Sequence, residues 1–307
     1  METKPETISL YQFFQRFPNE EAAREYFEVN RWGNEKSCPH CGSLSVVPVK
    51  DMKPMPYRCR DCRQHFSVRT GTVLAESRLP LQKWLLAIYM MTTARKGIPS
   101  TQMARELGVT QKSAWFLAQR IRETWLGTEG ISDMGPEVEV DETYIGGKNK
   151  NRHADKKVKG SGSYGKAAVL GIRDRCGEVR AAHVPNVQRE TLHGFIAQNV
   201  RPGSAVFTDS LPTYSGLQGY SHMIVDHSVG QYVRDMASTN GIESFWALLK
   251  RGYYGIYHYM SAKHLHRYVN EFSFRHNTAK GGTMHFIELT AGQMIGKRLT
   301  YKGLING

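Results

Sequence analysis

The sequence predicts a multidomain α/β protein in which two small units precede a larger domain with a mixed sheet. Three observations indicate this: two close pairs of cysteines, helical periodicity up to Trp125, and alternating strands beyond Gly127. A chain of 307 residues is long enough for two or more domains. We expect N-terminal helices over 1–31, a cysteine-bearing unit over 32–75, a helical unit over 76–130, the mixed-sheet domain over 131–280 and a tail over 281–307.

The four clustered cysteines have the spacing of a structural zinc site. Two Cys-x2-Cys pairs, separated by 17 residues, supply Cys38, Cys41, Cys59 and Cys62. Four thiolates complete the tetrahedral coordination of zinc and leave no position open for a substrate. The sequence therefore predicts a zinc ribbon that holds structure and performs no chemistry. Cys176, the fifth cysteine, is expected to be a small buried apolar residue.

Helical periodicity flanks this ribbon on both sides. Asn19 is placed to cap a helix before the ribbon, and Ser100 to cap the second of three helices after it. A glycine turn at 108–110 precedes the third helix, 111–125, which favours a helix-turn-helix. The third helix would then present its N-terminus to a major groove, with Gln111, Lys112 and Ser113. A helical spacer with a basic surface is the alternative.

Beyond Gly127 the pattern changes to strands mixed with helices. Strands are expected at 137–145, 167–173, 178–184, 205–208 and 222–226, and helices at 188–200, 240–251 and 261–277. This order favours one α/β domain with a mixed sheet.

The charge balance points to a polyanionic partner. Lys and Arg total 41 against 28 Asp and Glu, so the formal net charge is +13. Nucleic acid is the first candidate, because each cation that neutralises a phosphate releases a condensed counterion. We expect no membrane partner, since the most apolar stretch, 79–91, is too short to cross a bilayer. The N-terminus lacks the order of a signal peptide, so a reducing cytoplasm is expected.

A basic segment lies between the first two strands of the mixed-sheet domain. Glycine-rich stretches bound it, and its six cations are Lys148, Lys150, Arg152, Lys156, Lys157 and Lys159. Such a loop is able to follow a phosphate backbone. A merely solvated charged loop is the alternative.

Several carboxylates occupy positions where a sheet delivers side chains to a site. Asp141 interrupts an alternating strand in which Val138 and Val140 face the opposite way, and Asp209 ends a short apolar strand. Asn240, Glu243 and Lys250 fall within an arc of about 80° on a helix, because successive residues turn by 100°. Each residue also has a structural reading: Asp209 as a turn cap, and Glu243 with Lys250 as a surface pair.

Clustered carboxylates need a positive partner. Two like charges 4 Å apart repel by about 4 kcal/mol at an effective dielectric constant of 20. A pair of Mg²⁺ or Mn²⁺ ions would offset that repulsion and would also promote phosphoryl transfer.

Four segments resemble bacterial insertion-sequence transposases that join an N-terminal zinc ribbon to a DDE catalytic domain. They are Cys-Pro-His-Cys-Gly at 38–42, Phe-Ser-Val-Arg-Thr-Gly-Thr-Val at 66–73, Val-Glu-Val-Asp-Glu-Thr-Tyr-Ile-Gly-Gly-Lys at 138–148, and Thr-Asn-Gly-Ile-Glu-Ser-Phe-Trp-Ala-Leu-Leu-Lys-Arg at 239–251. The resemblance covers about residues 12–301. It implies an RNase H-like catalytic fold, recognition of terminal inverted repeats in double-stranded DNA, and metal-dependent strand cleavage followed by strand transfer.

The resemblance also implies roles for individual residues. Asp141 and Asp209 match the first two acidic metal ligands, and Lys250, followed by Arg251, matches the lysine that contacts the DNA end. For the third ligand the chain offers both Asn240 and Glu243; we favour Glu243, because an anionic ligand offsets more metal charge than an amide oxygen does. A nucleoid-associated homodimer or higher oligomer is expected, since two DNA ends must be handled together.

Two other functions remain open at this point. A regulator that binds DNA through the ribbon and helix-turn-helix would need no acidic cluster, and an RNase H-like nuclease would cut without rejoining. The tyrosines at 253, 254, 257 and 259 are expected to pack in the core, with stacking on an unpaired base as the alternative.

Overall fold

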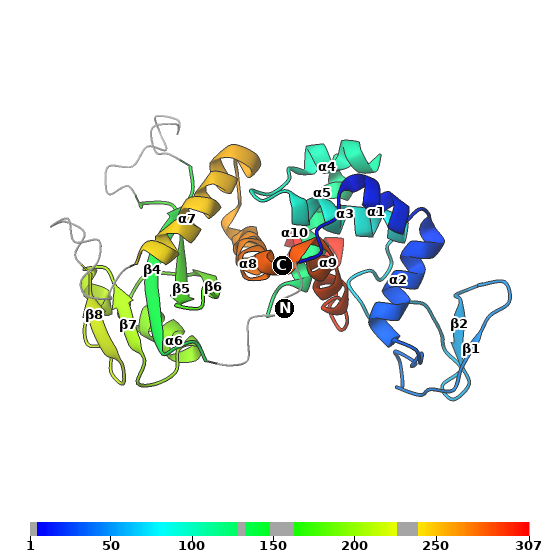
Figure 1. The fold of residues 1–307 in the computed structure, drawn as a ribbon, viewed down its shortest axis with the longest axis horizontal. Helices are drawn as coiled ribbons and strands as arrows, with labels where there is room; N and C mark the ends of the chain where they lie inside the picture. Colours follow the sequence, from blue (N-terminus) through cyan, green and yellow to red (C-terminus); the bar gives the residue numbers. More distant parts are fainter. Residues whose placement is uncertain (1–4, 128–132, 148–162, 226–238, 307) are drawn as a thin grey trace. The chain divides into compact units, whose positions relative to one another are not determined.

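The computed structural model describes residues 5–127, 133–147, 163–225 and 239–306. The chain divides into two compact units, and each is described by itself. Unit 1 comprises residues 1–128 together with 278–307, and unit 2 comprises residues 129–277. The C-terminal segment therefore returns to the N-terminal unit, a relationship that the sequence did not indicate. Most of the described elements are labelled in Figure 1.

Unit 1 begins with α1 (Leu10–Arg16) and α2 (Glu20–Trp32). The side chain of Asn19 accepts a hydrogen bond from the backbone N–H of Ala22, which confirms the predicted cap of α2. The ribbon follows as three short antiparallel strands, β1 (Val46–Pro48), β2 (Tyr57–Cys59) and β3 (His65–Phe66).

Three helices follow the ribbon, as predicted: α3 (Leu81–Thr93), α4 (Ser100–Leu107) and α5 (Gln111–Thr124). Gly108 ends α4 in the left-handed conformation, with φ of 60°, so the tight turn before α5 has the residue that it requires. The predicted cap at Ser100 is wrong, because Pro99 occupies the N-cap and makes no side-chain bond. Ser100 instead accepts a hydrogen bond of 2.8 Å from Nε2 of Gln111.

Two C-terminal helices complete unit 1, α9 (Gly282–Gly292) and α10 (Tyr301–Asn306). The buried indole of Trp125 packs edge-on against Phe286 and donates a hydrogen bond of 3.1 Å to Oγ1 of Thr290. Nζ of Lys297 lies 2.5 Å from the carbonyl oxygen of Thr124, at the end of α5. The C-terminal segment therefore forms part of the core of this unit.

Unit 2 is built on a five-stranded sheet with the order β6-β5-β4-β7-β8. The strands are β4 (Glu137–Ile145), β5 (Ala167–Asp174), β6 (Val179–Val184), β7 (Ala205–Thr208) and β8 (Ser221–Ile224). The first three pair antiparallel, whereas β7 runs parallel to β4 and β8 parallel to β7. This order and these directions are those of the RNase H-like fold, so the expected fold is confirmed.

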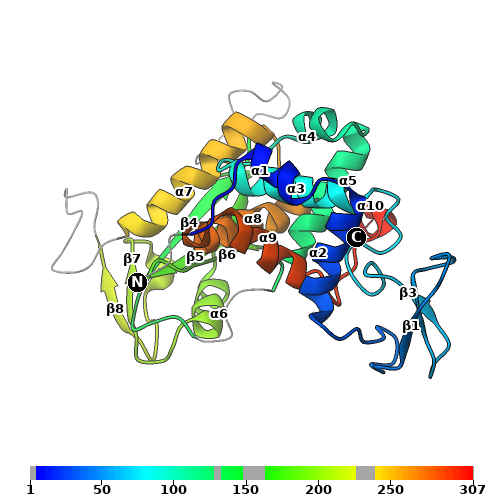
Figure 2. The same cartoon turned by 45° about the vertical axis from the view of Figure 1, so that its right-hand side comes forward.

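Helices cover both faces of this sheet (Figures 1 and 2). One face packs against α7 (Asn240–Gly252) and α8 (Ala262–Thr278), and the other against α6 (Arg189–Asn199). Cys176 lies in the turn between β5 and β6, where it is exposed, so the expectation of a buried thiol is wrong.

Candidate active site and zinc ribbon

The four ribbon cysteines converge as the spacing predicts. Their sulfur atoms all lie within 4.8 Å of one another, with 3.6 Å between Cys38 and Cys62 and 3.7 Å between Cys41 and Cys59. A hydrogen bond from the backbone N–H of Cys62 is the main cause that lowers the pKa of Cys59 to about 7, toward the thiolate that binds zinc. The buried core beneath is small, so the metal supplies much of the folding energy of the ribbon.

Asp141 lies in the central strand of the sheet in unit 2. Val138 and Val140 point into the cluster packed under α6, and Ile145 points into the cluster under α7. Because side chains alternate along a strand, Asp141 lies on the side opposite Val138 and Val140, as predicted, and this side faces α7. Its Oδ2 accepts a hydrogen bond of 3.0 Å from Nε1 of Trp246, which fixes the carboxylate against that helix.

The electrostatic surroundings of Asp141 are strongly unfavourable to its charge. Burial, and then the negative charges of Glu142 and Asp209, raise the pKa of Asp141 to about 7; the charge of Glu243 adds a smaller contribution in the same direction. Asp209 and Glu243 therefore lie close enough to Asp141 for their negative charges to raise its pKa. A divalent cation would reverse this penalty.

Asp209 follows β7, the parallel neighbour of β4 in the sheet. Its Oδ1 accepts a hydrogen bond of 3.1 Å from the backbone N–H of Leu211, so the turn-capping role considered from the sequence is present. That bond orients one carboxylate oxygen of Asp209. Asp209 follows the end of β7, and Asp141 follows the buried residues 138–140 of the neighbouring strand β4.

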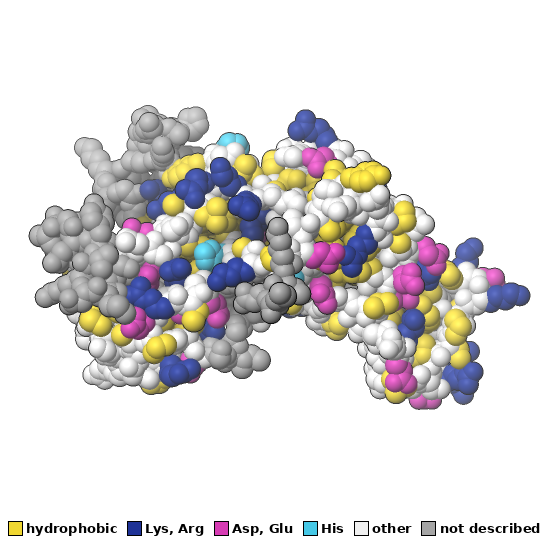
Figure 3. All heavy atoms as spheres, viewed as in Figure 1, with side chains coloured by type: hydrophobic (Ala, Val, Ile, Leu, Met, Phe, Trp, Pro, Cys, Tyr) yellow, Lys and Arg dark blue, Asp and Glu magenta, His cyan; other side chains and the backbone are white. Residues whose placement is uncertain are grey.

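Helix α7 carries the remaining predicted residues of the acidic site. Asn240, Glu243 and Lys250 are all exposed on this helix, whereas its buried face packs on the sheet. Oγ1 of Thr239 donates a hydrogen bond of 3.0 Å to Oε1 of Glu243. Lys and Arg side chains gather over the region of α7 on the face shown in Figure 3. Lys250 and Arg251, near the end of this helix, are exposed.

The acidic residues lie near one another without forming a tight cluster. Within the described residues, only the four cysteines bring three or more potential ligand atoms of His, Cys, Asp or Glu within 4.8 Å of one another. The donor chemistry of Asp141, Asp209 and Glu243, with the amide of Asn240, nevertheless fits a hard cation such as Mg²⁺ or Mn²⁺.

Two further acids belong to this region and were missed from the sequence. Glu142 accepts a hydrogen bond of 2.9 Å from the buried hydroxyl of Tyr214, and burial is the main cause that raises its pKa. Glu139 is 2% exposed and accepts a hydrogen bond of 2.8 Å from the backbone N–H of Ile242. The signal in the sequence was a run of acidic residues, at 137, 139, 141 and 142, in a strand that also carries Val138 and Val140.

The residues predicted to read DNA have mixed surroundings. Gln111 and Lys112 are exposed at the start of α5, where Ser113 Oγ lies 2.9 Å from Oγ1 of Thr110. Nζ of Lys112 lies 4.6 Å from the ring centroid of Tyr301, so α10 packs beside these residues. The basic segment with Lys148, Lys150, Arg152, Lys156, Lys157 and Lys159 lies outside the described residues.

The four tyrosines that follow α7 differ in how exposed they are: Tyr253 and Tyr257 pack against the core, whereas Tyr254 and Tyr259 are exposed. Tyr253 is buried, and the hydroxyl of Tyr257 donates to the buried carboxylate of Glu271, at 3.0 Å from Oε1. Tyr254 and Tyr259 are 44% and 72% exposed, respectively. Core packing is therefore right for the first pair and wrong for the second.

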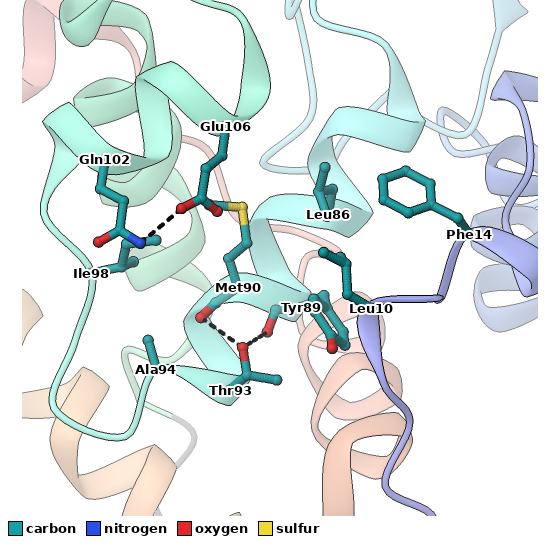
Figure 4. Close-up of a pocket in the computed structure, with 10 residues that line it drawn as sticks. All are labelled: Leu10, Phe14, Leu86, Tyr89, Met90, Thr93, Ala94, Ile98, Gln102 and Glu106. Carbon is teal, nitrogen blue, oxygen red and sulfur yellow. Dashed lines mark hydrogen bonds between the residues drawn. The ribbon is translucent and has the colours of Figure 1, made fainter. Parts of the chain in front are cut away.

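A hollow of about 590 Å³ lies in unit 1, apart from both sites (Figure 4). Its walls come from α1, α3 and α4, and they consist of Leu10, Phe14, Leu86, Tyr89, Met90, Thr93, Ala94, Ile98, Gln102 and Glu106. Glu106 is the one carboxylate among these lining residues, and it accepts a hydrogen bond of 2.7 Å from Gln102. This hollow has no group of titratable residues suited to catalysis.

Comparison with known proteins decides the family. Residues 133–277 match the ISXO2-like transposase domain, and residues 18–65 match the transposase zinc-ribbon domain. An uncharacterized transposase-like protein of Haemophilus influenzae is 32% identical over 99 residues, which cover 32% of this chain and 79% of that protein. The chain belongs to the ISXO2-like transposases.

A second relative of this transposase is an uncharacterized protein in the transposable element ISH50 of Halobacterium salinarum. The two are 28% identical over 249 residues, which cover 76% of this chain and 83% of that protein. Among solved structures, a pre-cleavage Mos1 transpososome has a TM-score of 0.20 and 12% identity, covering 63% of this chain and 78% of that one. The assignment of the fold therefore rests on the strand order of unit 2.

The transposase has a structural zinc site in its ribbon, supported by the matching domain and by the convergence of the four sulfurs. No helix in the described part of the chain has the length and apolar character that a membrane span needs.

Proposed function

We propose that this transposase recognises the terminal inverted repeats of an insertion sequence and cleaves and joins DNA strands with Mg²⁺ or Mn²⁺. The observation that carries the proposal is the position of Asp141. This carboxylate is held in the central strand of an RNase H-like sheet, under α7, where the charges of two other candidate ligands reach it. Burying a carboxylate among like charges costs stability, and such groups cluster at functional sites.

Each residue has a distinct task in this proposal. Asp141, Asp209 and Glu243 would hold the cations, and Asn240 would add a ligand or position one of them. The metal pair, when bound, would activate the attacking water or 3′-hydroxyl and stabilise the leaving oxygen. Lys250 and Arg251 would bind phosphates near the cleaved bond, because both are exposed at the far end of the helix that carries Glu243.

Two parts of the chain apart from the acidic residues would bind the DNA. The start of α5, in unit 1, would enter a major groove with Gln111, Lys112 and Ser113, and the basic segment after β4, in unit 2, would follow the phosphate backbone. The protein would act in the cytoplasm at the nucleoid as a homodimer or higher oligomer, since both ends of the element must be brought together.

The test uses labelled terminal-repeat DNA, a supercoiled target plasmid, Mn²⁺, and the full chain. We expect nicked ends and joined products with the wild type, and neither product with Asp141→Asn, although that variant still binds the ends. A shift in mobility without cutting in the wild type would support a regulator instead. Cutting without joined product would support a nuclease.

A further inference from the structure

Glu139 is a buried carboxylate that the proposed chemistry leaves without a task. It lies two residues before Asp141 on β4, so both side chains face α7. Its Oε2 accepts a hydrogen bond of 2.8 Å from the backbone N–H of Ile242. Its Oε1 lies 3.3 Å from Nη1 of Arg175 and 3.7 Å from Nη1 of Arg173. The buried carboxylate is therefore paired with two guanidinium groups.

The first turn of α7 depends on this carboxylate for an acceptor. The N–H groups of a first helical turn have no partner within the helix, and the N-cap residue, Thr239, supplies none from its side chain. Glu139 supplies one from the neighbouring strand, where its negative charge also complements the helix dipole. The hydrogen bond therefore fixes where α7 begins relative to β4.

Gly241 shows how closely the turn approaches this ion pair. A Cβ atom added there would lie 1.8 Å from Nη1 of Arg173 and 2.7 Å from Oε2 of Glu139. A side chain at this position would displace the guanidinium group of Arg173, the carboxylate of Glu139 or the first turn itself. Gly241 therefore lets the ion pair lie directly against the backbone of this turn.

We propose that Glu139 is a positioning residue of the active site. By holding the first turn of α7, Glu139 sets Asn240 and Glu243 opposite Asp141, which lies on β4 together with Glu139. Both oxygens of Glu139 are already engaged by Ile242 and the arginines, so it orients the ligands and is not one itself. This inference deepens the proposed function and rests on it. Residues of this kind change metal affinity or activity by about 10-fold to 100-fold when they are replaced.

Glu139→Gln tests the inference because it removes the charge and keeps the shape. We expect faster deuterium exchange in the peptide spanning 239–246, a smaller rise in melting temperature on adding Mn²⁺, and cleavage reduced by about 10-fold to 100-fold. Binding to terminal-repeat DNA should not change. A merely structural role would lower the melting temperature without changing its response to Mn²⁺.

Glu137→Gln is the matched control. Glu137 lies on the same strand and binds the same arginine, with Nε of Arg175 3.0 Å from its Oε2, but its side chain is 32% exposed. We expect wild-type exchange, Mn²⁺ response and cleavage in this variant. Equal effects of the two substitutions would overturn the role assigned to Glu139, as would an unchanged exchange rate and Mn²⁺ response in Glu139→Gln.

Gly241→Ala covers the case in which Glu139→Gln does not fold. It keeps Glu139 and both arginines in the sequence but places a methyl group against their contact with the first turn of α7, so the same three changes are expected. A folded Gly241→Ala protein with wild-type readings would overturn the inference. Failure of the proposed function is distinguishable, because the wild type would then show no metal-dependent cleavage at all.

Discussion

The indole Nε1 of Trp246 donates a hydrogen bond of 3.0 Å to Oδ2 of Asp141, across a position on β5 that has no side chain. That position is Gly171, which pairs directly with Asp141 in the sheet. A Cβ atom there would lie 2.6 Å from two carbons of the indole ring. Because Gly171 has no side chain, α7 lies close enough to β5 for Trp246 to reach the carboxylate of Asp141.

Replacing Trp246 by Phe should show what this contact contributes. The N–H donor to Asp141 would be lost, together with the two indole carbons that lie over Gly171, because a phenyl ring is shorter than an indole. We expect a loss of about 1 to 3 kcal/mol in the free energy of unfolding, measured with urea, and slower strand cleavage under single-turnover conditions. Cleavage at the wild-type rate with reduced stability would mean that the bond serves folding alone.

The pH dependence of stability should report on Asp141. Its pKa is raised to about 7 in the folded protein, from an ordinary value of 3.8. Between about pH 4 and pH 7 the folded state therefore holds a proton that the unfolded state lacks, so this group makes stability fall as pH rises. Asp141→Asn should flatten that fall and be more stable than the wild type at pH 8 by about 2 to 4 kcal/mol. Parallel curves from urea unfolding at several pH values would contradict the raised pKa.

The third ligand can be decided with two substitutions on the first turn of α7. Glu243→Gln removes an anionic ligand and should reduce Mg²⁺-dependent nicking by at least about 100-fold, as expected for a metal ligand. Asn240→Ala should have a smaller effect on nicking if Asn240 only positions a group. Full nicking activity in Glu243→Gln, with loss in Asn240→Ala, would reverse our assignment.

Zinc removal should unfold the ribbon and spare unit 2. The ribbon has three buried residues in its own core, so metal binding supplies most of its stability. We expect Cys59→Ser to release zinc and to weaken binding to terminal-repeat DNA, while the fragment over 133–277 stays resistant to proteolysis. Cys176→Ser is the control, because that thiol is exposed and lies in unit 2. Loss of protease resistance throughout the chain would contradict the independence of the ribbon.

Lys250 should contribute a single phosphate contact. Its side chain is exposed on the last turns of α7, so replacement by Gln should leave the fold unchanged. We expect the slope of log affinity against log salt concentration to decrease in magnitude by about 1 on double-stranded terminal-repeat DNA. An unchanged slope, measured by fluorescence anisotropy from low to moderate salt, would place Lys250 away from the backbone.

Local patterns predicted most of the elements. The cysteine spacing led directly to four converging sulfurs, because tetrahedral coordination admits few spacings. The alternation around Asp141 gave the face on which it lies, because side chains on a strand reverse direction at every residue. The predicted cap at Ser100 was wrong because the helix begins one residue earlier, with Pro99 as the N-cap and Ser100 as the first helical residue, and helix ends are defined only to within one or two residues.

The residues that assemble the site depend on contacts between distant parts of the chain. Nothing near Gly171 or Gly241 in the sequence indicates that an indole ring or a guanidinium group comes within reach of it. Glu139 has the same residue type as Glu137, two positions earlier on β4, and only the arrival of α7 makes their roles different. Such roles follow from the tertiary structure, which periodicity does not encode.

The return of residues 278–307 to unit 1 changes what a shortened protein would lose. A stop codon after Asn277 would keep every residue that we propose for chemistry, yet it would strip Phe286 and Thr290 from the indole of Trp125. Damage at the 3′ end of the gene would thus fall on the part proposed to hold DNA. Copies of the element with such a lesion would encode a protein that keeps the proposed catalytic residues but has a damaged core in the unit proposed to bind DNA.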